Sequence, residues 1–183
     1  MKIKVGVSNR HVHLKQSDLD ILFGCSLEKD FNLNQPNNFA SKNYVTIKTK
    51  KNQIDKVRVL GEIRSYTQVE ISKTDAYKLG INPPIKNTGD LVGSGNVDII
   101  GPIGQINVDA CIIANRHIHI STEDKLKYNL PDKVRIKING SKGGIIDNVY
   151  LKESPNAYFE LHLDTDDANA FLIKSDDEVD IID

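Results

Sequence analysis

The 183-residue sequence lacks the features that would mark a membrane, exported or nucleic-acid-binding protein. No run approaches the roughly 18–20 consecutive apolar residues that a membrane-spanning helix needs. The first residues, MKIKVGVSNRHVHL, alternate lysine with apolar residues, which predicts a strand instead of the apolar core of a signal peptide. A formal net charge of −1 gives no general attraction to nucleic acid. We therefore expect a soluble cytoplasmic protein.

Cysteine is also scarce in a chain of otherwise ordinary globular composition. Cys25 and Cys111 lie far apart and belong to no C-x-x-C motif. A disulfide between them could form, but two reduced, partly buried thiols are favoured. With 39% hydrophobic and 27% charged residues, the chain has the size of one large domain or two small ones of roughly 80–100 residues.

Alternation of apolar and polar residues, which is typical of half-buried strands, fills most of the chain. Strands are expected at residues 3–8, 44–50, 55–61, 67–72, 96–101, 106–114, 133–139, 144–152, 158–163 and 177–183. Short helices are expected at residues 15–24, 72–80, 121–129 and 164–174. Ser17 or Asp18 would cap the first helix and Ser72 or Thr74 the second. This pattern favours antiparallel barrels capped by helices over a βαβ sheet.

A repeated phrase carries most of the functional information. SNRHVHLK at residues 8–15 returns as ANRHIHIS at residues 114–121, and a helix follows each copy. Further along, VEISKTDA (69–76) aligns with LHLDTDDA (161–168), which sets Glu70 against His162. The repeat could be a trace of duplication without present chemistry, or two halves of one site. The second interpretation is favoured because all five histidines and one carboxylate fall into two matched sets: His11, His13 and Glu70, and His117, His119 and His162.

These residue types are suited to binding metal ions. Residues i and i+2 of a strand point to the same face about 6–7 Å apart, so a His-x-His pair can close on one ion such as zinc. Two exposed strand histidines would be the structural alternative, but the matched contexts favour metal. Three protein ligands leave a coordination position open, as in catalytic sites.

Several groups near these sets are suited to anions. Arg10 and Arg116 each precede a His-x-His pair and could form structural ion pairs or belong to the site. Arg64 would share a face with Glu70 if one strand ran through both, unless Gly61 breaks it. An arginine beside a dication suits phosphate or carboxylate, although a surface ion pair is the alternative. The Gly-containing stretch at residues 87–95 is a weaker candidate for a phosphate-binding loop.

No serine, cysteine or lysine nucleophile motif is present, and no histidine is left over to serve as a base. Covalent catalysis is therefore disfavoured. The expected ions would have to polarise a carbonyl, hold an anionic nucleophile or stabilise a leaving group.

The stretches VSNRHVHL, RVLGEIRSYTQVEIS, ANRHIHI and ELHLDTDDANA closely resemble the phosphate propanoyltransferase family, the propanediol-utilisation type of phosphotransacylase. The resemblance runs from about residue 3 to residue 181. It implies interconversion of a short-chain acyl-CoA, acetyl or propanoyl, and phosphate with an acyl phosphate and CoA. It also implies two β-barrels capped by short helices and related by internal duplication: a central domain of residues 9–105, and a second domain of residues 106–183 joined by residues 1–8. The site would lie between the barrels.

The resemblance also implies roles for individual residues. The two matched sets would each hold one Zn²⁺, or another divalent metal, and Arg64 would bind the phosphate. Phosphate held by Arg64 and one metal would attack the thioester directly. The positions that match CoA contacts are Ser8, Lys42, Arg58, Leu60 and Asn169.

The chain departs from the family in three places. Glu62 follows Gly61 where the family has proline, and Thr88 stands where serine is usual. The chain begins directly at its first strand, without the amphipathic extension of members packaged in microcompartments, which favours a cytosolic enzyme. A metal-dependent hydrolase and a non-enzymatic metal-stabilised barrel are the alternatives. A homodimer is compatible with the sequence, whereas the acyl preference and the physiological direction are undetermined.

Overall fold

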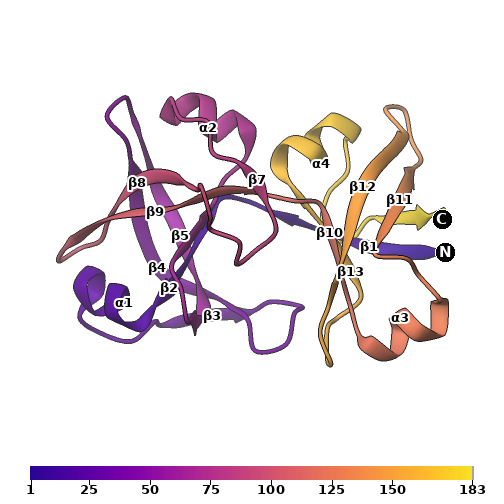
Figure 1. Ribbon diagram of the computed structural model, residues 1–183, viewed down its shortest axis with the longest axis horizontal. Coiled ribbons are helices and arrows are strands. Elements are labelled where there is room, and N and C mark those ends of the chain that lie inside the picture. Colours follow the sequence, from indigo (N-terminus) through magenta and orange to yellow (C-terminus); the bar gives the residue numbers. More distant parts are fainter. Residues whose placement is uncertain (183) are drawn as a thin grey trace. The chain divides into compact units, whose positions relative to one another are not determined.

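The computed structural model describes residues 1–182, and the chain divides into two compact units. One unit is the continuous segment Arg10–Ala114, and the other joins Met1–Asn9 to Asn115–Asp183. Both are mainly β with short helices, as the sequence predicts (Figure 1). Within the described residues, no helix is long and apolar enough to cross a membrane.

The unit Arg10–Ala114 contains a closed six-stranded barrel in which the strand order is β4-β5-β2-β6-β9-β8 and β8 pairs with β4. Two short strands, β3 and β7, pair with β4 and β9 of this barrel and were not expected from the sequence. The elements are β2 (His11–Lys15), α1 (Gln16–Phe23), β3 (Lys29–Asn32), β4 (Phe39–Lys48), β5 (Gln53–Arg64), β6 (Gln68–Glu70), α2 (Lys73–Leu79), β7 (Ile85–Lys86), β8 (Gly95–Ile100) and β9 (Gln105–Ala114).

The second unit contains a closed barrel with the strand order β1-β13-β10-β12-β11-β14. In Figure 1 the indigo β1 runs among the orange and yellow strands of this unit, because β1 pairs with β13 and β14. The elements are β1 (Lys2–Ser8), β10 (His117–Ile120), α3 (Thr122–Tyr128), β11 (Lys133–Ile138), β12 (Gly144–Glu153), β13 (Glu160–Asp164), α4 (Thr165–Phe171) and β14 (Glu178–Ile181).

The two barrels have the same topology and the same register. In one barrel β2 lies between β5 (parallel) and β6 (antiparallel), and in the other β10 lies between β12 (parallel) and β13 (antiparallel). His11 lies directly opposite Glu70, and His117 lies directly opposite His162. The alignment of Glu70 with His162 made from the sequence therefore corresponds to equivalent positions in the two sheets.

The equivalent of β1 is β9, and the two strands are exchanged between the halves of the sequence. β9 pairs in parallel with β6, as β1 does with β13, and each pairs with its other neighbour antiparallel. Residues 106–114, which the sequence-based division assigned to the second domain, thus form most of a strand in the unit Arg10–Ala114. The boundary between the units falls after Ala114.

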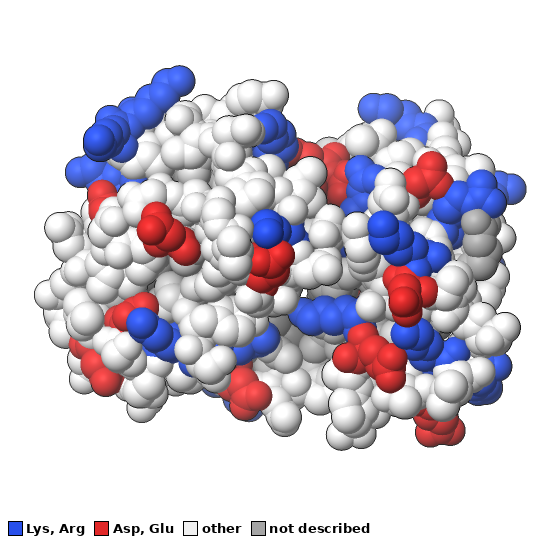
Figure 2. All heavy atoms as spheres, in the orientation of Figure 1, with Lys and Arg blue, Asp and Glu red and all other residues white. Residues whose placement is uncertain are grey.

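Alternating burial explains why these segments are strands. Along β11 every second residue is buried, namely Val134, Ile136 and Ile138, and their side chains line the core of that barrel. The equivalent core of the other barrel is built on residues such as Val12, Val59 and Val69. Lysine, arginine, aspartate and glutamate side chains of both signs are interspersed on the face shown in Figure 2, in keeping with the net charge of −1.

The helix ends follow the sequence signals with one exception. Ser72 caps α2 in a reciprocal capping box with Asp75, and Asp164 caps α4. The expectation that Ser17 or Asp18 caps α1 is wrong, because that helix starts directly after Lys15, which makes no side-chain cap. Asp18 instead accepts a 2.6 Å hydrogen bond from the buried Thr67 hydroxyl, a long-range contact that the local sequence does not reveal.

Candidate metal centres and substrate-binding residues

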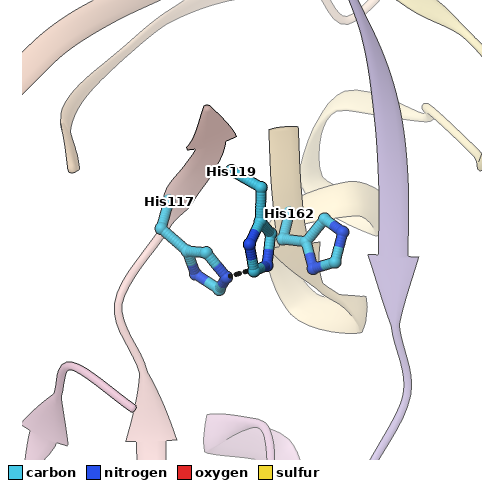
Figure 3. Close-up of side chains that lie close together, drawn as sticks. All are labelled: His117, His119 and His162. Atoms are coloured by element: carbon cyan, nitrogen blue, oxygen red, sulfur yellow. Dashed lines mark hydrogen bonds between the residues drawn. The ribbon is translucent and has the colours of Figure 1, made fainter. Parts of the chain in front are cut away.

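The second matched set of predicted ligands converges inside the unit that contains β10 and β13. One donor atom from each of His117, His119 and His162 lies within 4.8 Å of the other two. The Nε2 atoms of His117 and His119 are 3.2 Å apart (Figure 3). Two nitrogens at about 2.0–2.1 Å from one tetrahedral zinc ion would be separated by about 3.3 Å, so this spacing fits a shared ion.

The rings of His117 and His162 are each oriented by an oxygen atom that lies close to one of their two ring nitrogens. The Nδ1 atom of His117 donates to the carbonyl of Asn115 at 2.8 Å, which leaves Nε2 of His117 as the donor atom for an ion. The Nε2 atom of His162 lies 2.7 Å from a carboxylate oxygen of Glu160, a nearly fully buried residue. In Figure 3 the other ring nitrogen of His162 is turned toward His119. The donor chemistry and its surroundings therefore fit a three-histidine metal centre.

The first matched set converges in the same way in the unit Arg10–Ala114. Donor atoms of His11, His13 and Glu70 lie within 4.8 Å of one another, and all three residues are buried. Nε2 of His11 is 3.5 Å from Oε2 of Glu70. The other carboxylate oxygen of Glu70 accepts hydrogen bonds from the Gln68 amide at 2.5 Å and the Thr88 hydroxyl at 3.4 Å. Oε2 of Glu70 is thus the oxygen directed at His11, and the short bond from Gln68 to Oε1 orients the carboxylate.

Arg10 and Arg116 form structural ion pairs, which decides between the two alternatives that the sequence left open. Nε and Nη2 of Arg10 each lie 2.8 Å from a different oxygen of Asp75, the third residue of α2. Arg116 binds Asp167, the third residue of α4, at 2.8 and 2.7 Å in the same two-pronged manner. Hydrogen bonding to the carboxylate raises the pKa of each guanidinium above its ordinary value. Each arginine thereby ties the strand with the His-x-His pair to the helix that follows the third predicted ligand.

Arg64 ends β5 and has donor capacity that its hydrogen bond to Asn38 does not use. β5 runs through Gly61 and ends at Arg64, and β6 begins only at Gln68, so Arg64 and Glu70 lie on separate strands and the condition for a shared face is not met. Within residues 1–182, Arg64 donates to a single side chain, the amide oxygen of Asn38 at 3.0 Å, and forms no ion pair. Its Nε is buried and makes no hydrogen bond to any described atom. An uncompensated guanidinium of this kind is suited to an anionic ligand.

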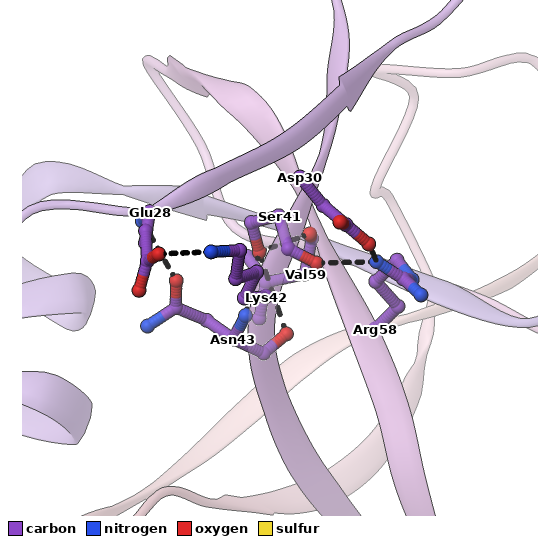
Figure 4. Close-up of polar contacts among 7 residues, drawn as sticks. All are labelled: Glu28, Asp30, Ser41, Lys42, Asn43, Arg58 and Val59. Atoms are coloured by element: carbon purple, nitrogen blue, oxygen red, sulfur yellow. Dashed lines mark hydrogen bonds and ion pairs between the residues drawn. The ribbon is translucent and has the colours of Figure 1, made fainter.

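Lys42 and Arg58 lie close together but hold carboxylates of their own chain (Figure 4). Arg58 pairs with Asp30 at 2.8 Å and also donates to the carbonyl of Ser41 at 2.6 Å. Lys42 pairs with Glu28, and this hydrogen bond raises the pKa of the Lys42 ammonium above its ordinary value. The guanidinium of Arg58 also stacks near the half-exposed rings of Tyr44 and Phe31, with centroids 4.8 and 5.6 Å away.

The remaining predicted CoA contacts are distributed over both units. In the register of β2 and β5, Arg58 lies opposite His11 and Leu60 lies opposite His13, so both neighbour the first set of predicted ligands. Ser8 ends β1, and Asn169 lies exposed on α4, in the other unit.

The loop at residues 87–95 uses some of its amides internally. The amide of Gly89 donates to Oε1 of Gln68 at 2.8 Å, and that of Asp90 donates to the carbonyl of Asn87 at 3.0 Å. These two amides are therefore engaged, which weakens the interpretation of this loop as a phosphate-binding loop. The loop contributes more clearly to the position of Glu70. Thr88 donates to Glu70 directly, and Gly89 donates to Gln68, which in turn donates to Glu70.

Sequence reasoning missed two buried polar residues, Gln68 and Glu160. Both occupy the position two residues before the third predicted ligand, in QVE at residues 68–70 and in ELH at residues 160–162. Gln68 is completely buried and Glu160 nearly so. Residues two apart in a strand share a face, so a polar residue at this position in both copies was a signal that could have been followed.

The chain is similar to known proteins over most of its length. A family model described as Phosphate propanoyltransferase matches residues 4–174. A phosphate propanoyltransferase of Thermotoga maritima is 44% identical over 186 aligned positions, which cover 98% of this chain and 89% of that protein. Those of Rhodopseudomonas palustris and Priestia megaterium are 41% and 42% identical, covering 97% and 96% of this chain and 81% and 83% of the relatives.

The family model and these relatives span nearly the whole chain, including both His-x-His pairs and Arg64. The resemblance noted from the sequence motifs is thus confirmed, and with it the assignment of the chain as an enzyme that transfers acyl groups to or from phosphate. The chain belongs to the phosphate propanoyltransferase family.

Proposed function

We propose that the protein interconverts propanoyl-CoA and phosphate with propanoyl phosphate and CoA by direct attack of bound phosphate on the thioester. The substrate class follows from the names of the relatives, and the direct route follows from the chain's own residues. The single observation that carries the proposal is the state of Arg64, an arginine with a buried, unbonded Nε and no carboxylate partner among the described residues.

Arg64 binds the phosphate in this proposal. Arg10, Arg58 and Arg116 each have an aspartate partner, so their positive charge is compensated within the chain. Arg64 has only the neutral amide of Asn38. A guanidinium matches two oxygens of a tetrahedral anion, and it would offset the charge repulsion between phosphate and the developing oxyanion of the thioester. Asn38 holds the guanidinium in place without neutralising it.

The two convergent sets hold the metal ions, with Zn²⁺ favoured by the imidazole donors. His11, His13 and Oε2 of Glu70 form one centre, and His117, His119 and His162 form the other. When bound, such ions stabilise negative charge on oxygen or sulfur by acting as Lewis acids. His117 and Glu70 are each fixed by a second hydrogen bond, so these side chains are already oriented for the ion.

CoA is held by Lys42, Arg58, Leu60, Ser8 and Asn169. Lys42 and Arg58 supply the positive charge that the phosphate groups of CoA require, after exchanging Glu28 and Asp30 for those groups. The remaining three contribute polar and apolar contacts. We also propose a cytoplasmic location, because propanoyl-CoA and phosphate are charged, water-soluble molecules that do not cross a membrane unaided.

The test is phosphate-dependent release of CoA thiol from propanoyl-CoA by the metal-loaded protein. Loss of an oxyanion or phosphate donor of this kind lowers kcat/KM by about 10²–10³-fold. We expect such a loss in Arg64→Ala, with partial recovery in Arg64→Lys. The matched control is Arg135→Ala, which removes the same charge from an exposed position on β11. Arg64→Ala with full activity would refute the assigned role.

The same assay separates the alternatives. A metal-dependent hydrolase would release thiol without phosphate, whereas a non-enzymatic barrel would release none from any acyl-CoA. Parallel reactions with acetyl-CoA and propanoyl-CoA establish the preferred acyl group.

A further inference from the structure

Glu160 is a nearly fully buried carboxylate beside the three-histidine centre. Only 3% of the residue is exposed, and its Oε2 lies 2.7 Å from Nε2 of His162. The backbone makes room for this contact at Gly6 on the neighbouring strand β1, which lies opposite His162. A Cβ atom at Gly6 would stand 3.0 Å from Cδ and Oε2 of Glu160 and 3.1 Å from Cδ2 of His162. The absence of a side chain at Gly6 therefore permits the two residues to lie together against β1.

The contact determines which nitrogen of His162 would be available to bind a metal ion. An ionised carboxylate only accepts hydrogen bonds, so Nε2 of His162 carries the proton and Nδ1 is left with its lone pair. Nδ1 is the nitrogen that Figure 3 shows turned toward His119. In His117 the arrangement is reversed, because Nδ1 donates to the Asn115 carbonyl and Nε2 faces inward.

The equivalent position in the other barrel shows what the carboxylate contributes. Gln68 lies opposite His13, as Glu160 lies opposite His119. The first centre thus has a neutral amide at this position and a carboxylate as the third predicted ligand, Glu70. The second centre has the carboxylate at this position and a neutral imidazole as the third ligand. Each centre would therefore have one negative charge, which is the predicted ligand Glu70 in the first and Glu160, one hydrogen bond from His162, in the second.

We propose that Glu160 is a positioning residue that fixes His162 as an Nδ1 ligand and supplies the negative charge that the three-histidine centre otherwise lacks. The inference rests on the proposed metal centre but not on the acyl-transfer reaction. Carboxylates that accept from metal-bound imidazoles orient the ring and raise its basicity, and their loss costs about 10–100-fold in metal affinity.

The experiment measures zinc affinity by competition with a chromophoric chelator, in full-length protein carrying His11→Ala so that only the second centre binds. Three variants are compared in this background. Glu160→Gln removes the charge and keeps an acceptor, and Glu160→Leu removes both. Glu153→Gln is the control, since it removes one charge from β12 of the same unit at a residue paired with Lys125. Nitrogen-15 spectra of the labelled histidines report the bound nitrogen of each ring.

The expected result is a loss of about 10-fold in zinc affinity for Glu160→Gln and up to about 100-fold for Glu160→Leu, with no change for Glu153→Gln. The spectra should show His162 bound through Nδ1 and His117 through Nε2. Unchanged affinity in both Glu160 variants, or binding of His162 through Nε2, would overturn the inference. Absence of zinc binding with Glu160 intact would overturn it together with the metal centre. Because the experiment measures zinc affinity and not acyl transfer, its result can be interpreted even if the proposed reaction is wrong.

Discussion

Replacing Arg10 by methionine tests whether the arginine–aspartate pairs hold the candidate metal centres in place. Arg10 makes two bonds of 2.8 Å to Asp75, whose side chain is only 4% exposed, while that of Arg10 is 34% exposed. Removing the guanidinium leaves a buried carboxylate that then accepts only a long, 3.5 Å hydrogen bond from the Ser72 amide within the described residues. Methionine preserves much of the apolar stem, so the change isolates the charge.

The magnitude follows from the exposure of the two partners. Breaking a fully buried pair costs about 3–5 kcal/mol, and breaking an exposed pair costs about 0–1 kcal/mol. The Arg10–Asp75 pair is buried on one side and partly exposed on the other, so we expect about 2–3 kcal/mol. At about 4–8 °C per kcal/mol for a unit of this size, the transition of that unit should fall by roughly 8–24 °C.

Calorimetry of the metal-loaded protein measures this shift. The double variant Arg10→Met/Asp75→Asn removes the uncompensated charge and should recover more than half of the loss. Arg116→Met is the matched variant in the other barrel, because Arg116 binds Asp167 in the same way. We expect Arg10→Met to weaken zinc binding at the first centre and Arg116→Met at the second. A shift below about 2 °C, or a double variant less stable than the single one, would refute the reasoning.

Two further predictions concern the sheets around the sites. Burial raises the pKa of the Cys111 thiol to about 12, against an ordinary value of 9.0. At pH 8 this thiol should therefore react with a disulfide reagent about 1,000-fold more slowly than an ordinary thiol, whereas the exposed Cys25 should react at the ordinary rate. The raised pKa also stabilises the fold below pH 9, and this contribution is lost as the pH rises from 9 toward 12. If both thiols of the native protein reacted at the ordinary rate, the burial of Cys111 would be contradicted. Gly61→Ala should cost about 1–3 kcal/mol in urea unfolding, because a Cβ there would lie 2.1 Å from the ring of Phe39, and Phe39→Leu in the same chain should recover part of this loss. Equal stability of the single and double variants would exclude this clash as the cause.

Much of the architecture could be predicted from local patterns. Strands with strict alternation, such as β11, bury every second residue as expected, and Ser72, Ser121 and Asp164 cap their helices. The cap of α1 was mispredicted, because Asp18 lies inside the helix and is bound by Thr67, 49 residues away in sequence. The strands β3 and β7 are short pieces at an edge and lack a strong periodic pattern.

The candidate site was predictable where duplication made it visible. The alignment that placed Glu70 against His162 is matched by the register of β6 and β13, and each set of three converges. The roles of these residues in metal binding stay predictions. The separate strands expected at residues 55–61 and 67–72 already placed a break before Glu70, but β5 continues past Gly61 to Arg64, which the glycine did not indicate.

The partners of Arg10 and Arg116 also could not be predicted from the local sequence. Asp75 and Asp167 lie 65 and 51 residues further along the chain. Both aspartates sit in the aligned segments SKTDA and DTDDA, so the repeat contained the pairing, but only the sheet register brings the partners together.

The exchange of β1 and β9 between the barrels affects the order in which the barrels can close during synthesis and the way the chain can be circularly permuted. β1 is synthesised before β13 and β14, with which it pairs, so that barrel cannot close until residue 181 has been made. The backbone of Met1 is bonded in both directions to Ile181, at 2.9 and 2.7 Å. A circularly permuted gene that opens before Arg10 and links the old ends would therefore encode each barrel as one uninterrupted segment.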